Sequence, residues 1–148
     1  MHLSKLLEGK GKVVILRYAV GAASSMARED GFLEAISNSK DMIVTVKNLY
    51  AGSTAGEAKT ASINLLDKLK EADGIFCPNE STTFGMLLAL RQSNLAGKKR
   101  FVGFDTSPPL VESLKNGEID AVVAQDPTRI GFEAVKNLVG SIKAEKVS

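Results

Sequence analysis

The sequence is poor in the side chains on which most enzymes depend. Its 148 residues include one histidine, His2, close to the amino terminus, and one cysteine, Cys77. A lone histidine at a chain end gives no support to Ser-His-Asp or Cys-His catalysis. Histidine, cysteine and carboxylate residues nowhere gather at the spacing of metal ligands. We therefore expect no catalytic residue and no metal site, and a single cysteine excludes an internal disulfide.

Motifs that bind nucleotide cofactors are missing as well. The segment Gly21-Ala22-Ala23-Ser24, which follows the first apolar run, has one glycine and does not match the G-x-G-x-x-G fingerprint. The sequence also has no G-x-x-x-x-G-K-[ST] run for binding phosphates. Ser24 and Ser25 could bind an anion at a helix N-terminus, but we interpret them as helix-capping residues. No cofactor is expected.

Aromatic residues, long apolar runs and clustered charges are also scarce. There is no tryptophan, and aromatic residues make up 5%, which predicts a core of small aliphatic side chains. No apolar run approaches the ~20 residues that span a bilayer. Residues 1–12 do not resemble a signal peptide, so the sequence as given is expected to stay in the cytoplasm. The net charge of +2, with acids and bases interleaved, predicts no nucleic-acid partner.

The apolar segments that are present alternate with helical patterns. This alternation predicts an α/β fold, a three-layer sandwich with an open, parallel five-stranded sheet and helices on both faces. Right-handed crossovers favour the flavodoxin-like strand order 2-1-3-4-5. No linker or low-complexity tract interrupts the chain, so we expect one domain over residues 1–148. The predicted strands span residues 12–18, 42–49, 74–77, 100–104 and 119–124, and the predicted helices span residues 2–8, 24–38, 54–72, 80–95, 108–115 and 127–144.

The segment from Arg100 to Leu138 contains the same unit twice. Each unit is an apolar strand that ends in a polar side chain, Asp105 or Gln125, followed by a proline and a helical pattern. Ser107 and Asp126 each precede the proline, as N-cap residues do when proline takes the first helical position. The two polar residues are therefore expected at the carboxyl ends of neighbouring strands.

Four polar side chains are expected at this edge of the sheet, where open α/β sheets bind ligands. They are Arg28, Asn79, Asp105 and Gln125. Arginine donates hydrogen bonds, aspartate accepts them, and the amides do both. Such a set matches the neighbouring hydroxyls of a ring, each of which must donate and accept once it leaves water. A buried polar group left unmatched costs ~1–3 kcal/mol, so such a site would reject ligands that lack a hydroxyl.

Each of the four residues also has a local explanation. Arg28 could pair with a neighbouring carboxylate of its own helix, and Asn79 could simply cap the helix that follows it. Asp105 could cap the next turn of the chain, and Gln125 could be an exposed strand end. For each residue taken alone, the local explanation is the stronger one. The four polar side chains at matching strand ends favour a shared site only when they are taken together.

Six short motifs match segments of a known protein family. They are Arg28-Glu29-Asp30-Gly31-Phe32, Cys77-Pro78-Asn79-Glu80, Gly85-Met86-Leu87-Leu88-Ala89-Leu90, Gly103-Phe104-Asp105, Asn116-Gly117-Glu118-Ile119-Asp120-Ala121 and Val123-Ala124-Gln125-Asp126-Pro127-Thr128-Arg129-Ile130-Gly131. Together they resemble the C-terminal lobe of the periplasmic sugar-binding proteins of ABC transporters, of the ribose-binding-protein type. The resemblance runs from about Lys12 to about Val139, and the Gln-Asp-Pro…Ile-Gly run is its most specific part.

This resemblance implies half of a sugar clamp. In the family, two α/β lobes close on a monosaccharide, and the closed form docks on a membrane permease. The residues that the C-terminal lobe supplies correspond by motif to Arg28, Asn79, Asp105 and Gln125. The family often places an aromatic residue after the second strand, where this sequence has Gly52 or Ser53. The resemblance therefore implies no preference for ribose itself, and other pentoses, hexoses or a cyclitol remain open.

The resemblance covers the C-terminal lobe and not the N-terminal one. We expect an isolated lobe, whose missing N-terminal lobe, permease and periplasmic location belong to a full-length parent. Without the opposite wall of the cleft, this chain is expected to bind sugar weakly or not at all, and its exposed face predicts some self-association. Two alternatives are the effector-binding core of a sugar-responsive transcription repressor and a flavodoxin-like enzyme. The missing nucleophile–base pair and cofactor loop count against the enzyme.

Overall fold

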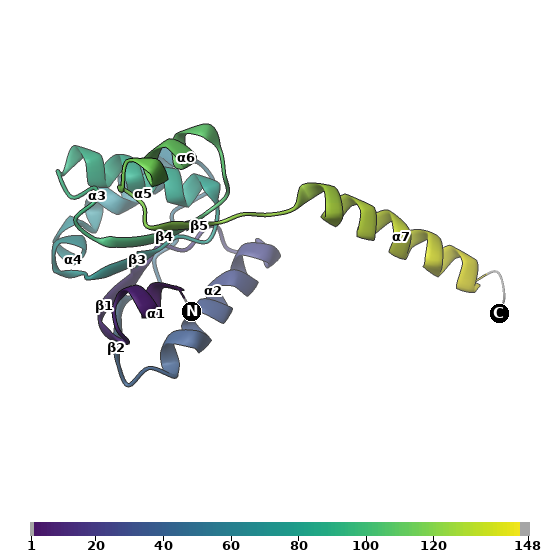
Figure 1. Cartoon of the computed structure of the whole chain (residues 1–148), viewed down its shortest axis with the longest axis horizontal. Helices are drawn as coiled ribbons and strands as arrows, with labels where there is room; N and C mark the ends of the chain where they lie inside the picture. Colours follow the sequence, from purple (N-terminus) through teal and green to yellow (C-terminus); the bar gives the residue numbers. More distant parts are fainter. Residues whose placement is uncertain (1, 146–148) are drawn as a thin grey trace.

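The computed structural model describes residues 2–145, which form a parallel sheet with helices on both faces (Figure 1). In chain order the elements are α1 (His2–Leu6), β1 (Lys10–Ile15), α2 (Ala23–Ser37), β2 (Asp41–Val46), α3 (Ala55–Asn64), α4 (Leu66–Glu71), β3 (Gly74–Phe76), α5 (Glu80–Gln92), β4 (Arg100–Phe104), α6 (Pro108–Lys115), β5 (Ala121–Val123) and α7 (Pro127–Glu145). The strand order is β2-β1-β3-β4-β5, and all neighbouring strands are parallel. The predicted fold class and strand order are thus confirmed.

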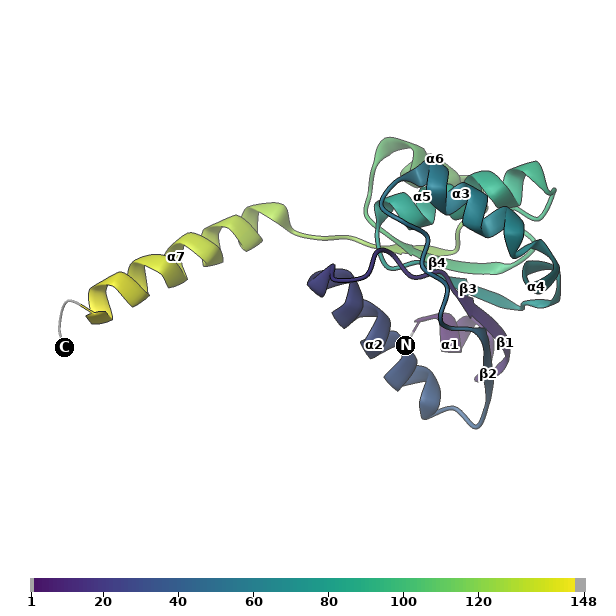
Figure 2. The ribbon, with the colours of Figure 1, turned by 180° about the vertical axis from the view of Figure 1, so that it is seen from behind.

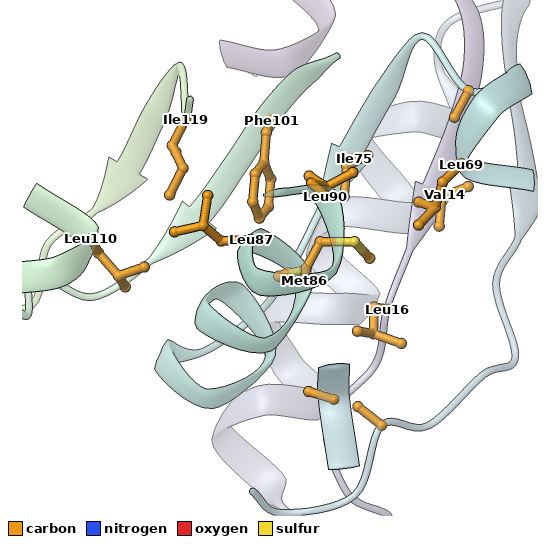
Figure 3. Close-up of a cluster of buried hydrophobic side chains, with 14 residues drawn as sticks. Val14, Leu16, Leu69, Ile75, Met86, Leu87, Leu90, Phe101, Leu110 and Ile119 are labelled. Atoms are coloured by element: carbon orange, nitrogen blue, oxygen red, sulfur yellow. The ribbon is translucent and has the colours of Figure 1, made fainter. Parts of the chain in front are cut away.

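Two hydrophobic clusters join the sheet to its helices. On one face, α3 to α6 pack over β1, β3 and β4, and Figure 3 shows Leu87 and Leu90 of α5 beside Phe101 of β4. On the other face, α1 and α2 pack against the sheet. There the ring of Phe32 stacks on that of Phe76, with centroids 4.2 Å apart. The three predicted layers are therefore present.

The last helix, α7, leaves these layers. Figures 1 and 2 both show it extending from the end of β5 away from the sheet. Its large apolar side chains are each 43–65% exposed, and all except Ile130 recur on one side of the helix: Ile130, Phe132, Val135, Leu138, Val139 and Ile142. Within residues 2–145, no helix combines the length and apolar content that crossing a membrane requires. The apolar side of α7 is thus a large hydrophobic surface in contact with solvent.

The loop after the first strand begins earlier than predicted. β1 ends at Ile15 instead of Tyr18. Arg17 continues a looser pairing with the loop after β2, because its N–H donates to Leu49 O at 2.9 Å and its carbonyl accepts from Ala51 N–H at 2.8 Å. Arg17 and Tyr18 therefore belong to the carboxyl edge of the sheet and not to its interior.

The predicted helix over residues 54–72 is divided. Leu65, with φ −95° and ψ 7°, separates α3 from α4. This break lets Ala58 of α3 and Leu69 of α4, both fully buried, reach the same core cluster. No proline or glycine marks the break, so the helical pattern alone predicted one continuous helix.

The start of α2 also differs from the prediction. Ser24 and Ser25 lie inside the helix, and Ala22, which has no polar side chain, stands at the N-cap position. The prediction that a serine caps α2 is therefore wrong. Two other caps are confirmed: Asn79 Oδ1 accepts from the Thr82 N–H at 3.2 Å, and Asp126 Oδ1 accepts from the Arg129 N–H at 2.9 Å.

Candidate functional site

The four predicted residues lie along the carboxyl edge of the sheet. Arg28 is in α2, and the others follow β3, β4 and β5 as Asn79, Asp105 and Gln125. The strand order places β1 beside β3, so the chain turns to opposite sides of the sheet after these two strands. A ligand crevice of an open α/β sheet lies at such a switch point.

A continuous set of hydrogen bonds joins three of the four residues. Arg28 Nη2 donates to Gln125 Oε1 at 3.1 Å, across 97 positions of the chain. Gln125 Nε2 in turn donates to Asp105 Oδ1 at 2.5 Å. The other carboxylate oxygen, Asp105 Oδ2, accepts from the backbone N–H of Glu80 at 3.0 Å. Elements α2, β5, β4 and α5 thus meet in one polar network.

Arg28 is held in place from two further sides. Its Nη1 donates to the carbonyl of Pro78 at 2.9 Å, and its guanidinium carbon lies 4.5 Å from the centroid of the Phe104 ring. The ring quadrupole attracts a cation in that position. The neighbouring carboxylates, Glu29 and Asp30, pair with Arg17 instead of Arg28. The side chain of Arg28 is therefore directed to the sheet edge.

Asn79 lies beside this network without joining it. Its Oδ1 accepts from the Thr82 N–H and from Thr82 Oγ1, the latter at 2.7 Å, so the local explanation as a helix cap is confirmed. Within the described residues, no hydrogen bond joins Asn79 to the other three. Asn79 nevertheless lines a cavity that Asp105 also lines, and its side-chain amide includes a donor, Nδ2.

Asp105 has an unusual backbone conformation. Its φ is +73°, in the left-handed region that residues other than glycine rarely adopt. Aspartate and asparagine tolerate this region better than most residues, and positions of this kind cluster at functional sites. The conformation lets the carboxylate face both Gln125 and the start of α5.

Two adjacent cavities open at this edge, and Glu80 and Asp105 line both. The first has a volume of about 370 Å³ and lies at the switch point, where Tyr18 and Asn79 form part of its wall. The second, of about 560 Å³, lies beside Gln125 and the start of α7. Asp105 stands between them and can accept hydrogen bonds from either side.

The loop after β1 also contributes to this edge of the sheet, which the sequence did not predict. Glu29, 1% exposed, accepts from Arg17 Nε at 2.6 Å and from the Tyr18 N–H at 2.9 Å. The hydrogen bond that Arg17 donates to Glu29 raises the pKa of the Arg17 guanidinium, which therefore stays charged. The polar Arg17-Tyr18 pair directly after an apolar run is the available signal, although the predicted strand over residues 12–18 includes it.

The described residues offer little for covalent or metal chemistry. Cys77 is fully buried, and burial raises the pKa of its thiol well above the ordinary value, so the nucleophilic thiolate is suppressed. Among the described residues, no three His, Cys, Asp or Glu side chains form a group that could hold a metal ion. The donors and acceptors at the edge are suited to hydrogen bonding with a neutral polar ligand.

The sequence of this chain matches a known protein family and several of its members. Residues 2–146 match the periplasmic binding protein domain. The D-allose-binding periplasmic protein of Escherichia coli is 30% identical over 145 residues, which cover 98% of this chain and 46% of that protein.

Solved structures agree with this match. The periplasmic component of an ABC-type sugar transport system from Hahella chejuensis is 34% identical, with a TM-score of 0.84 over 93% of this chain and 50% of that one. A carbohydrate transporter solute-binding protein from Agrobacterium radiobacter, in complex with D-arabinose, is 28% identical, with a TM-score of 0.84 over 99% of this chain and 51% of that one. The chain belongs to the periplasmic binding protein domain family, and it spans about half the length of its sugar-binding relatives.

Proposed function

We propose that this chain is one ligand-binding lobe, a single domain over residues 1–148, of a solute-binding protein for sugar uptake by an ABC transporter. It would supply hydrogen bonds to a monosaccharide or a cyclitol from Arg28, Asn79, Asp105 and Gln125. The observation that carries the proposal is the network that joins Arg28, Gln125 and Asp105 at the carboxyl edge. These side chains come from separate elements and meet where a ligand of this fold is bound.

The chemistry of the network suits vicinal hydroxyls. Arg28 presents donors in a planar fork, Asp105 presents two acceptor oxygens, and the Gln125 amide has both kinds of atom. A ring hydroxyl that replaces a bond within the network finds a donor on one side and an acceptor on the other. Because the groups already hold one another in place, little side-chain freedom is lost on binding.

The other partners follow from the relatives. In a full-length parent, the second lobe would cover the sugar from the opposite side, and the pair would deliver it to a permease from the periplasm. The relatives are periplasmic sugar-binding and transport proteins, which does not favour the repressor alternative. No enzymatic step is part of the proposal.

The direct test is a titration of the 148-residue chain with D-ribose, D-allose, D-arabinose and a cyclitol, followed by NMR chemical shifts and by calorimetry. One open wall leaves most of the ligand in water, whereas small-molecule sites bury about 70–90% of their ligand. We therefore expect dissociation constants in the millimolar range, with shifts concentrated around Asp105 and Gln125. Micromolar binding by this chain alone would contradict the half-site interpretation.

Asp105→Asn is expected to weaken that binding about tenfold or more, because the amide replaces one acceptor oxygen by a donor. Asparagine tolerates the left-handed backbone of position 105, so the fold and its stability should change little. Thermal unfolding checks this point. Asp126→Asn, at the N-cap of α7, is the matched control, and equal binding losses in both variants would count against a specific role for Asp105.

We also expect this chain to self-associate through the exposed apolar side of α7. Exposed apolar patches of this kind mark interaction surfaces. Light scattering over a concentration series should show a rising mean mass, and Leu138→Glu should return it to the monomer value. Asn137→Glu, on the polar side of the same helix, should leave the association unchanged. A monomer at every concentration would refute the prediction.

A further inference from the structure

A short linker joins α7 to the rest of the chain. β5 ends at Val123 and α7 begins at Pro127, so residues 124–126 form the whole connection. Gln125, in the middle of the linker, is fixed by its hydrogen bonds in the polar network. Asp126 precedes a proline, and residues in that position favour an extended backbone. The linker therefore directs α7 away from its own sheet, as Figures 1 and 2 show.

The apolar side chains of α7 need a surface to cover them. Five of them lie on one side of the helix, and each is 43–65% exposed: Phe132, Val135, Leu138, Val139 and Ile142. We call these five residues the helix stripe. A helix with an apolar stripe of this kind normally packs it against the core of a protein. The detached position of α7 leaves the helix stripe in contact with solvent.

The sheet has an apolar surface at its β5 edge that is only partly covered. The strand register pairs Val102 with Ala121 and Phe104 with Val123. The first three of these residues belong to the cluster on the face that α1 and α2 cover, so Val123 lies on that face as well. There Val123 is 44% exposed, whereas Val122 packs against the core of the opposite face. We call Phe104, Ala121 and Val123 the acceptor face.

We propose that α7 of one chain packs its helix stripe on the acceptor face of a second copy, whose own α7 packs back in the same way. The two copies are then related by a two-fold axis and make identical contacts. Exchange of one element between identical chains is a low-cost route to a dimer, and short hinge segments favour it. This inference goes beyond sugar binding, since no sugar takes part in the exchange.

The size of the exchanged helices fits a stable dimer. The 19 residues of α7 form a helix about 28 Å long and about 10 Å wide, with a footprint of about 280 Å². Counted on both contacting surfaces and for both helices, the exchange buries roughly 1,100 Å², close to the ~1,200 Å² at which the range of specific stable interfaces begins. One helix docked without a return contact would bury half of that area, so the area favours a reciprocal exchange.

A longer linker tests the exchange. Insertion of Gly-Ser-Gly-Ser between Gln125 and Asp126 would let α7 fold back onto the acceptor face of its own chain. Light scattering should then show an about twofold fall in mass, at a concentration where the original chain is a dimer. The amide signal of Val123 should keep its dimer chemical shift, because the same contact forms within one chain. If the α7 helices paired with each other instead, the insertion would leave the mass unchanged, and the proposal would be wrong.

A mixed-label experiment locates the contact. Cys77 is fully buried, so a spin label directed to Lys136→Cys, beside the helix stripe, should react at that position alone. The labelled chain is refolded together with a ¹⁵N-enriched copy that has no spin label. The amide signals of Ala121 and Val123 in the ¹⁵N-enriched copy should broaden. Broadening confined to residues 132–142 would indicate paired α7 helices and would contradict the exchange.

A charge on the acceptor face should prevent the exchange. Val123→Glu is expected to weaken dimerisation about tenfold or more, because the carboxylate would be buried under the partner's helix. Leu114→Glu, at an exposed apolar position of α6, is the matched control and should leave dimerisation unchanged. Thermal unfolding checks that both variants are folded.

Two results would overturn the inference: unchanged dimerisation of Val123→Glu, or a monomer at every concentration of the original chain. Neither result bears on the proposed function, because the sugar titrations are read independently of the mass. Conversely, a dimer with the expected contacts that binds no sugar would leave this inference standing and refute the proposed function.

Discussion

Glu29→Ala is expected to lower the free energy of unfolding by about 3–5 kcal/mol, the usual cost of removing one partner from a buried ion pair. Glu29 is 1% exposed and the side chain of Arg17 is 12% exposed, so the pair lies almost entirely out of water. The substitution leaves the Arg17 cation without its main partner and the Tyr18 N–H without an acceptor. Urea denaturation of both proteins measures the difference.

Two variants sharpen this test. Glu29→Gln should cost less than Glu29→Ala, since the amide oxygen can still accept from the Tyr18 N–H. Glu34→Ala, on the same helix, should change the free energy of unfolding by no more than about 0.5 kcal/mol, as surface substitutions usually do. If Glu29→Ala lowered the free energy of unfolding as little as Glu34→Ala, the ion pair would contribute nothing measurable to stability. The inference that α2 positions Tyr18 and Arg28 would then be unsupported.

The second large effect is expected at Gly85, where α5 passes against α3. A Cβ atom at this position would lie 2.4 Å from Ala58 Cβ and 2.6 Å from the backbone oxygen of Ala55. A backbone atom cannot move aside by a side-chain rotation, so Gly85→Ala must push the two helices apart. Overpacking of this kind costs about 1–3 kcal/mol or more. The shift would also displace the start of α5, which carries Asn79 and Ser81.

Gly31→Ala is the matched control, because the sign of its effect should be opposite. Gly31 lies in the middle of α2, and a Cβ there would have no atom within 4 Å. Alanine is favoured over glycine in a helix interior by about 0.5–1 kcal/mol, so this variant should be more stable than the original chain. Thermal melts of the two variants give the comparison. Destabilisation of similar size in both would show that α3 and α5 are not in such close contact.

The fold was largely predictable because its signals are local. Apolar runs of strand length alternated with helical patterns, and proline or asparagine stood at several helix starts. These features depend on residues a few positions apart, so the sequence displays them directly. The right-handed crossover rule then left few strand orders, and the predicted order was correct. Errors arose where no local signal existed, as at the break at Leu65.

The candidate site was predictable only in outline. Asp105 and Gln125 could be placed at strand ends from the chain alone, because parallel strands end at the same edge of a sheet. The bond between Arg28 and Gln125 could not, since it joins positions 97 residues apart and depends on how α2 lies against the sheet. The same holds for Glu29, which the sequence showed as a possible partner of Arg28 and which the structure pairs with Arg17.

By itself, the sequence determined the α/β class, the strand order, the helix caps at Asn79 and Asp126, and the edge of the sheet where polar groups gather. Only the tertiary structure decided which of those groups contact one another, that Tyr18 and Ser81 line the same cavity as Asn79 and Asp105, and that the apolar side of α7 is exposed. The reason is physical. Periodicity and capping arise from hydrogen bonds and burial within a few residues, whereas a site depends on side chains brought together by the packing of separate layers.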